Sequence, residues 1–405
     1  MKRIFLILMF CSCLPGLIWA QESKIKPGVV LTGENYKNYL IDLKDLLPPA
    51  TFMAYSRGLE KEWITMPVVE RRKYPPPKGF GEATARYAGT CQAGPNNKLI
   101  GWKAGLPFYP HPKNGLELAW NAYRRRMHPD DGLFPATFYL ISKEGKIERT
   151  FKWILYKKDW IGRVDKPPLG EMSNNNGLLN SKESIIITEP FDVKGFCIVR
   201  IKYEDIERED DNFSFIPAIR RIRRLTGADV TDPLLGSDAI PDDFEVWRQK
   251  INPKMNFKIF DEKDILVPRF YGYEEGLQDL PVESYIKGAC YQVDWEIRPC
   301  WILEIMENDP DYAYTRRLIY IDKEDGASTL WVGENFDQKG RLFRASPCLP
   351  VYYNFKNGLK GNWGFHYSNC LTGHSTFLDM KEFDLSGVDV PVNKFTIRAL
   401  LKEAR

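Results

Sequence analysis

The sequence predicts a β-rich α+β protein built on one large antiparallel sheet with a few helices. Three observations carry this prediction: apolar and polar residues alternate over many short segments, tight turns separate those segments, and only two stretches have helical periodicity. The chain also carries 23 Phe, 20 Tyr and 11 Trp among 405 residues, and aromatic side chains favour strands. Short connections cannot join parallel strands, which need long crossovers, so we expect an antiparallel sheet.

Alternation marks the individual strands. Residues 137–142 and 147–156 flank Lys143-Glu144-Gly145-Lys146, a typical hairpin turn. Further alternating segments are residues 197–203, 293–306, 314–322, 329–336 and 341–345. Short polar connections join the last four of them into a meander. A sheet with this many strands must curl, split or be covered.

Two segments have the periodicity of amphipathic helices. In residues 33–47, aromatic and leucine side chains recur every three or four positions, and Pro48 and Pro49 are expected to end the helix. Residues 115–126 form the second helix, with three arginines in the last turn, where they suit the negative helix end. The Pro- and Lys-rich residues 67–81 are expected to cross the surface. The two helices are candidates for covering one face of the sheet.

Residues 1–20 predict a secretory signal peptide. A basic pair precedes an apolar run, and Ala20 supplies a small residue before the expected cleavage. The alternatives are a membrane anchor, which needs a longer apolar run of ~20 residues, and a lipoprotein leader ending at Cys11 or Cys13, which would be very short. We therefore expect residues 21–405 to be exported as a single large β domain with an N-terminal helical segment and an irregular C-terminal extension.

Composition argues against two classes of function. The chain has 57 Lys plus Arg against 54 Asp plus Glu, a formal net charge of +3, whereas nucleic-acid binding needs a concentrated basic surface. It has only 4 His, and no Cys/His cluster has zinc spacing, so we expect neither a metal nor another cofactor.

Six cysteines follow the leader, and an even number in an exported chain permits disulfides. Cys348 and Cys370 flank a stretch that can fold back on itself, and they form the pair that we favour. Free buried thiols are the alternative, most clearly for Cys197 within Phe196-Cys197-Ile198-Val199.

Signals for catalysis are thin, and we predict a protein that is not an enzyme. GxSxG is absent, and Gly79-Phe80-Gly81 lacks the third glycine of a dinucleotide loop. Three acidic doublets adjoin turn residues and are expected to be solvated in loops; they are Asp130-Asp131, Asp210-Asp211 and Asp242-Asp243.

The densest basic cluster consists of Arg220, Arg221, Arg223 and Arg224. In an extended chain, Arg221 and Arg223 face one side while the other two face the opposite side. One interpretation is a solvated strand with acidic neighbours. The other is contact with an anion or with an acidic membrane partner.

The aromatic residues of the predicted strands and of the second helix have two interpretations. Most simply they form the core of the sheet. Alternatively, the concave face of a curved sheet is only partly filled and makes a pocket for an acyl chain or a ring system. In that case the ligand-binding residues are expected to be Trp120, Tyr123, Trp153, Leu155, Trp295, Trp301 and Trp331.

Several ordered motifs resemble one known family. Gly101-Trp102-Lys103-Ala104-Gly105-Leu106-Pro107-Phe108 is followed by Gly115-Leu116-Glu117-Leu118-Ala119-Trp120-Asn121, and later by Trp295-Glu296-Ile297-Arg298 and Arg317-Leu318-Ile319-Tyr320-Ile321-Asp322. Together these segments resemble domain-of-unknown-function family 1329, often labelled outer membrane lipoprotein-sorting protein. The resemblance extends roughly from residue 28 to residue 359.

The resemblance implies a large relative of the periplasmic lipoprotein carrier fold. That fold is a curved antiparallel sheet, an incomplete barrel, whose concave side is closed by helices over a hydrophobic cavity. It also implies a periplasmic protein, or one associated with the outer membrane, that works with exporters of the resistance-nodulation-division type. No catalytic residues can be carried over.

The sequence leaves three functions to be compared. The first is a periplasmic carrier or binding protein for a lipid or another hydrophobic molecule. The second is a non-catalytic structural or adaptor protein that docks on an exporter or an outer-membrane partner, with a filled core. The third is an envelope hydrolase, which no motif supports.

Overall fold

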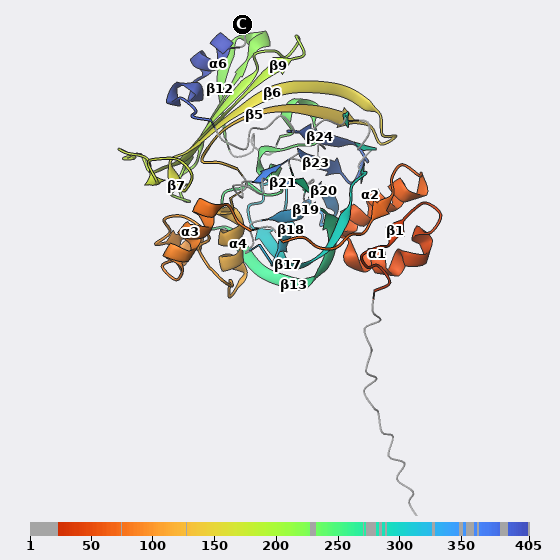
Figure 1. Ribbon diagram of the computed structural model, residues 1–405. Helices are drawn as coiled ribbons and strands as arrows, with labels where there is room; N and C mark the ends of the chain where they lie inside the picture. Colours follow the sequence, from red (N-terminus) through yellow and green to blue (C-terminus); the bar gives the residue numbers. More distant parts are fainter. Residues whose placement is uncertain are drawn as a thin grey trace, which may run out of the picture.

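The structure is a computed structural model, shown as a ribbon in Figure 1. It describes residues 23–73, 75–126, 128–226, 232–269, 271–272, 281–282, 286–287, 290–325, 329–347, 351–353, 360–362, 364–380 and 388–403. The predicted signal peptide lies outside the described residues.

One sheet of 13 strands dominates the fold, and every neighbouring pair in it is antiparallel. Its order is β12-β11-β10-β9-β6-β5-β24-β23-β20-β19-β18-β17-β13, so β12 and β13 are the two edges and the sheet does not close. Figure 1 shows how strongly it curves, with β5 and β6 arching over the strands from β17 to β20. The expected incomplete barrel with few helices is confirmed.

The strands of this sheet fall into two runs along the chain. The first run comprises β5 (Asp131–Ile141), β6 (Ile147–Asp159), β9 (Leu179–Glu189), β10 (Cys197–Tyr203), β11 (Asp211–Ile216) and β12 (Arg221–Leu225). The second comprises β13 (Met255–Pro268), β17 (Trp295–Glu307), β18 (Arg316–Asp322), β19 (Leu330–Phe336), β20 (Leu342–Pro347), β23 (Gly364–Asn369) and β24 (Ser375–Asp379).

Short strands form small separate ladders. They are β1 (Val30–Leu31), β2 (Met66–Pro67), β3 (Gln92–Ala93), β4 (Leu99–Ile100), β7 (Ile161–Arg163), β8 (Gly170–Glu171), β14 (Tyr271–Gly272), β15 (Ile286–Lys287), β16 (Cys290–Tyr291), β21 (Val351–Tyr353) and β22 (Lys360–Asn362).

The α-helices in the described ranges are α1 (Leu40–Leu46), α2 (Pro49–Glu60), α3 (Lys78–Tyr87), α4 (Gly115–Tyr123) and α6 (Ile397–Glu403). The two predicted helices are present as α1 and α4, but α4 ends at Tyr123, so the three arginines follow the helix and do not lie in its last turn. The prolines after α1 do not end helical structure, because Pro49 is the first residue of α2, where its missing N–H costs nothing. Residues 67–81, which we expected to cross the surface, contain the start of α3.

Side-chain alternation buries both faces of the strands β6, β9 and β10. Trp153 and Leu155 point into the concave side, whereas Tyr156, Ile186 and Val199 belong to a second cluster with Phe395 and Leu400. That cluster lies under α6 and the 3-10 turn before it, so the end of the chain covers the convex face here.

A segment without regular strands crosses the hollow of the sheet, and we call it the inner segment (residues 234–251). It touches both halves of the sheet. The Phe244 ring lies 6.3 Å from the Trp153 ring on β6, and Tyr314 Oη on the other half donates a hydrogen bond to Asp243 Oδ2 at 2.7 Å. Trp247 and Ile251 are fully buried. The inner segment therefore fills much of the concave side, a role that we expected of helices.

The C-terminal part is more regular than the expected extension. β23 and β24 form a hairpin in the middle of the sheet, where β24 pairs with β5 and β23 pairs with β20. The tract lacks long alternation because each strand has only five or six residues.

Candidate functional site

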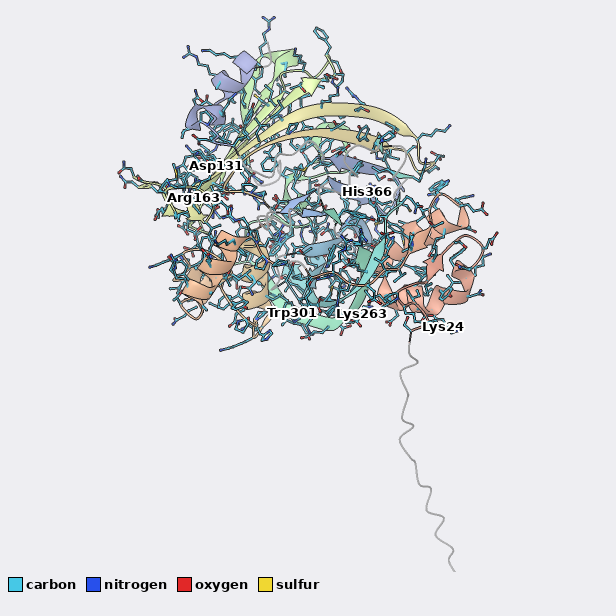
Figure 2. All side chains as sticks on the ribbon, viewed as in Figure 1. Lys24, Asp131, Arg163, Lys263, Trp301 and His366 are labelled. Atoms are coloured by element: carbon cyan, nitrogen blue, oxygen red, sulfur yellow. The ribbon has the colours of Figure 1, made fainter. Side chains whose placement is uncertain are left out.

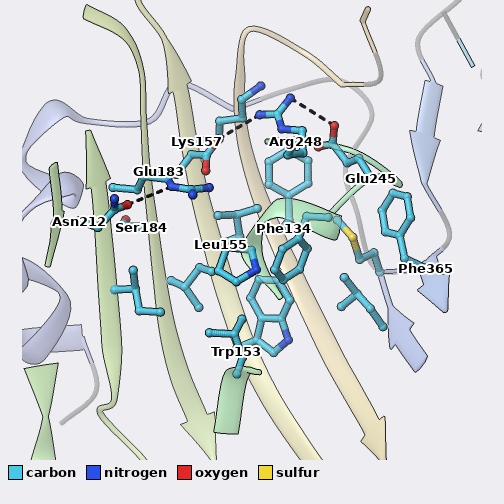
Figure 3. Close-up of a pocket in the computed structure, with 18 of the residues that line it drawn as sticks. Phe134, Trp153, Leu155, Lys157, Glu183, Ser184, Asn212, Glu245, Arg248 and Phe365 are labelled. Atoms are coloured by element: carbon cyan, nitrogen blue, oxygen red, sulfur yellow. Dashed lines mark hydrogen bonds and ion pairs between the residues drawn. The ribbon is translucent and has the colours of Figure 1, made fainter. Parts of the chain in front are cut away.

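A largely apolar cavity of about 100 Å³ lies between the concave face of the sheet and the inner segment. We call it the apolar cavity, and Figure 3 shows it. Its walls come from the first run of strands, from the inner segment and from the C-terminal hairpin. The apolar side chains that line it are Phe134, Trp153, Leu155, Ile185, Ile198, Leu225, Leu234, Phe244, Phe365, Leu378 and Met380.

Cross-strand rows on the concave face change from apolar to charged along the strand direction. Leu155 pairs with Ile185, which pairs with Ile198. Two residues further along β6, the next row is Lys157, Glu183, Arg200 and Asn212. The row after that is Asp159, Ser181 and Lys202. Side chains on one face of a strand recur every two residues, so the strand register gives the cavity an apolar end and a charged end.

The charged end is held together by shared ion pairs. Arg248 of the inner segment lies 3.0 Å from Glu183 (Nη2–Oε1) and 3.3 Å from Glu245 (Nη1–Oε2), as Figure 3 shows. Lys157 lies 2.8 Å from His128 (Nζ–Nε2). Burial lowers the pKa of His128, and the neighbouring Lys157 lowers it further, so this imidazole is neutral at pH 7.

A second cavity of about 70 Å³ adjoins this charged end, and we call it the cationic cavity. It shares His128, Lys157 and Arg248 with the apolar cavity. Its other charged side chains are Arg124, Arg125, Arg126, Asp159 and Lys202. The two cavities are therefore adjacent compartments with one common wall.

The structure separates the seven predicted ligand-binding residues into three groups. Trp153 and Leu155 line the apolar cavity, and Tyr123 lines the cationic cavity. The remaining four pack in the core and line neither cavity; they are Trp120, Trp295, Trp301 and Trp331. For these four the sheet-core alternative describes the structure.

Specific partners hold three of those core tryptophans. Trp120 Nε1 donates to the carbonyl of Asn97 at 3.0 Å, and Trp331 Nε1 donates to Asp322 Oδ2 at 3.0 Å. The Trp295 ring meets the Tyr55 ring edge-on at 4.6 Å.

The arginine cluster lies at the edge strand β12, and none of its side chains lines either cavity. Arg221, Arg223 and Arg224 are exposed, and Arg224 pairs with Asp211 (Nη2–Oδ1, 2.6 Å). Arg220 is not extended as we expected, because it ends a 3-10 turn with a φ of 50°. Charged side chains on an edge strand discourage pairing with another sheet. Contact with an anion or a partner stays a prediction.

The favoured disulfide cannot be described, because Cys348 lies outside the described residues. Within the described ranges Cys370 forms no disulfide, and neither do the buried Cys91, Cys197, Cys290 and Cys300. Those ranges also contain no cluster of His, Cys, Asp or Glu suited to a metal ion.

Two of the acidic doublets are not solvated, contrary to expectation. Asp131, the first residue of β5, is buried between Lys158 (Oδ2–Nζ, 2.6 Å) and Arg163 (Oδ1–Nη1, 2.8 Å), and Figure 2 labels Asp131 and Arg163 close together. Asp243 is buried against Arg317. The neighbouring turn residues suggested exposed loops. In the structure, these carboxylates are buried and pair with basic side chains that lie far away in the sequence.

Comparison with known proteins identifies the family. A family described as a protein of unknown function, DUF1329, matches residues 30–400. The chain belongs to this family. No match is found among curated proteins.

A solved structure of low sequence identity shows the fold. A candidate outer membrane lipoprotein-sorting protein domain from Vibrio parahaemolyticus is 18% identical with a TM-score of 0.50, covering 71% of this chain and 98% of that one. A DUF1329 protein from Desulfovibrio piger is 17% identical (TM-score 0.48, 67% and 92% covered). A LolA-superfamily protein from Nitrosomonas europaea is 14% identical (0.44, 70% and 98%).

The charged end of the site in this DUF1329 chain was not predicted from the sequence. The predicted strand ended at residue 156, whereas β6 continues to Asp159 and carries Lys157 inward. The available signal was alternation, because Lys157 continues the row of Trp153 and Leu155. The inner segment gave no periodic signal at all.

Proposed function

We propose that this protein is an exported carrier that binds a hydrophobic molecule in the apolar cavity. The observation that carries the proposal is the apolar row of the concave face, Leu155, Ile185 and Ile198, facing a cavity instead of packed side chains. Moving apolar ligand surface from water to such a wall gains ~25 cal/mol per Å².

The volume of the apolar cavity requires a movement. Ligand pockets usually have roughly 300–1,000 Å³, whereas this one has about 100 Å³. A lipid-sized molecule therefore needs the inner segment to move away from the sheet. The segment has no strand pairing that would have to be broken, and side-chain contacts such as that of Phe244 with Trp153 fix it instead.

The export of the protein is part of the same proposal, with the periplasm as its compartment. It rests on the predicted signal peptide and the resemblance to carriers. None of the helices in the described ranges combines the length and apolar character that a membrane span needs. An exporter of the resistance-nodulation-division type or an outer-membrane partner stays a prediction.

Binding is tested with two matched variants of β6. Leu155→Asn places an amide in the apolar cavity, whereas Ile154→Asn places it on the opposite face; both positions are half-buried in the native protein. We expect Leu155→Asn to weaken binding of an apolar fluorescent probe at least tenfold and Ile154→Asn to leave it within about twofold. Native mass spectrometry of gently purified protein should also show a bound lipid-like molecule.

Two results would contradict the proposal. One is the absence of any bound apolar probe or co-purified lipid, which would favour the adaptor function with a filled core. The other is equal weakening by both variants, because this would reflect general destabilisation and not a loss of the cavity wall.

A further inference from the structure

The wall of the cationic cavity presents more positive than negative side chains, and this bears on the ligand of the proposed carrier. Six cations line it, namely Arg124, Arg125, Arg126, Lys157, Lys202 and Arg248, and one carboxylate, Asp159. Five of the six are less than 10% exposed, and only Arg248 is half-buried. So many desolvated cations around a void need compensation by anions.

Carboxylates of the protein supply only part of that compensation. Arg124 pairs with Glu204 (2.6 Å) and Arg126 pairs with Asp130 (2.8 Å), both outside the cavity wall. The other four cations share three carboxylates, which are Asp159, Glu183 and Glu245. In the described part of the chain, the six cations thus have five carboxylates within ion-pair distance.

Lys202 is the least well compensated of these cations. Its ammonium lies 3.4 Å from Glu183 Oε1, an oxygen that is already 3.0 Å from Arg248 Nη2. Burial lowers the pKa of Lys202 to about 8, and Glu183 offsets only part of that effect. Burial also lowers the pKa of Lys157. A bound anion would restore the favourable environment that these two ammonium groups lack.

The two compartments adjoin each other, so one molecule can span both once the inner segment that carries Arg248 moves. His128, Lys157 and Arg248 line both cavities, and the rows of β6, β9 and β10 pass from apolar to charged without a break. The cationic cavity has about 70 Å³, whereas a water needs roughly 10–15 Å³ on this measure. It therefore suits one small oxyanion group.

We propose, on the basis of the carrier function above, that the ligand is an anionic amphiphile. Its apolar chain lies in the apolar cavity, and its single phosphate or carboxylate group lies in the cationic cavity between Lys202, Lys157 and Arg248.

The test compares three probes at monomeric concentrations: dodecyl phosphate, dodecanol and inorganic phosphate. Binding is measured by isothermal titration calorimetry and by displacement of an apolar fluorescent probe. We expect dodecyl phosphate to bind the wild-type protein at least tenfold more tightly than dodecanol, and inorganic phosphate to bind at least 100-fold more weakly than dodecyl phosphate.

Two lysine variants make the test specific to the cationic cavity. Lys202→Met should reduce the preference for dodecyl phosphate over dodecanol to less than threefold, while the affinity for dodecanol stays within twofold. The control is Lys182→Met on the neighbouring strand β9, since Lys182 lines neither cavity and lies over the Trp160 ring at 4.8 Å. It should keep the wild-type preference.

The outcomes separate this inference from the carrier function. Equal affinity of the wild-type protein for dodecyl phosphate and dodecanol would overturn the inference and leave the carrier function intact. Failure of both to bind would overturn both. Inorganic phosphate binding as tightly as dodecyl phosphate, or equal effects of the two lysine variants, would also overturn the inference.

Discussion

His366 on β23 is a fully buried imidazole near the centre of the molecule, labelled in Figure 2. Neither ring nitrogen has a hydrogen-bond partner among the described residues, and the ring meets Tyr291 edge-on at 5.5 Å. Burial lowers its pKa from 6.5 to about 3. The folded protein therefore keeps this side chain neutral where an unfolded chain would protonate it.

We predict that His366 makes the fold sensitive to acid. Its folded-state pKa is lowered, so its contribution is fully present above pH 6.5 and is lost as the pH falls below that value. Between pH 7 and pH 5 the wild type should lose about 2 kcal/mol more than His366→Phe. Urea unfolding at both pH values, followed by tryptophan fluorescence, measures this difference.

The control for this experiment is the same substitution at the exposed His111. It should leave the pH dependence of the wild type unchanged. Parallel loss of stability in wild type and His366→Phe would show that the imidazole does not remain neutral on folding.

Glu334 connects an element of the sheet to a helix. This buried side chain on β19 accepts a hydrogen bond from the backbone N–H of Ala50 in the first turn of α2 (2.7 Å) and another from Tyr320 (3.2 Å). Burial raises the pKa of Glu334 to about 7. The helix is therefore docked through a carboxyl group that changes its charge near neutral pH.

We predict that Glu334 reverses the usual pH trend at this junction. Because its folded-state pKa is raised above 4.5, the folded protein binds the extra proton, and stability increases as the pH falls from 8 to 5. This contribution is about 2–3 kcal/mol and should be absent in Glu334→Gln, which keeps an acceptor for Ala50. Denaturation at pH 8 and pH 5 tests it; identical slopes in both proteins would refute it.

Helix α4 packs closely on the edge strand β13. A Cβ on Gly115 would lie 2.4 Å from the backbone nitrogen of Lys258, too close for any real contact. We predict that Gly115→Ala destabilises the protein by about 1–3 kcal/mol, although alanine is the better helix former. Asn114→Ala removes only the helix cap, whose side chain accepts from the Glu117 N–H, and should cost about 1 kcal/mol.

Chemical denaturation of both helix variants decides this point. A stabilised Gly115→Ala protein would mean that α4 is free to move away from β13. In that case the close approach would not determine the position of the helix.

Strands with a clear polar–apolar alternation were predictable from the sequence, and elements fixed by distant partners were not. β6, β10 and the strands from β17 to β20 match the expected segments within a few residues. β13 escaped because it is an edge strand whose charged residues blur the pattern. The predicted end of β6 also hid Lys157, since a run of Lys, Lys and Asp resembles a solvated turn until Glu183 and Arg248 bury it.

At the scale of the whole molecule, the inner segment controls the volume of the site. Asp238, near its start, is tied to β24, because Thr376 Oγ1 donates to Asp238 Oδ2 at 3.0 Å and accepts from the Asp238 N–H at 2.9 Å. The carrier function requires this segment to shift.

We predict that fixing the inner segment abolishes ligand uptake. Asp238→Cys combined with Thr376→Cys places two thiols where side chains already touch, so oxidation should link the segment to β24. Uptake of an apolar probe should fall at least tenfold in the oxidised double variant and recover on reduction. Peptide mass spectrometry confirms the bridge, and oxidised Thr376→Cys alone is the control.

Unchanged uptake in the bridged protein would mean that ligands reach the cavity by another path. It would leave the cavity wall in place and remove the inner segment from the mechanism.

The position of the hairpin β23–β24 has a consequence for biosynthesis. In the order of strands within the described sheet, the hairpin lies between the two runs, and its residues 375–379 pair with residues 137–141, more than 230 positions earlier. Contacts so far apart in sequence form late and slowly. During synthesis, the pairing that joins the two runs of strands in the sheet therefore forms only after nearly the whole chain has been made.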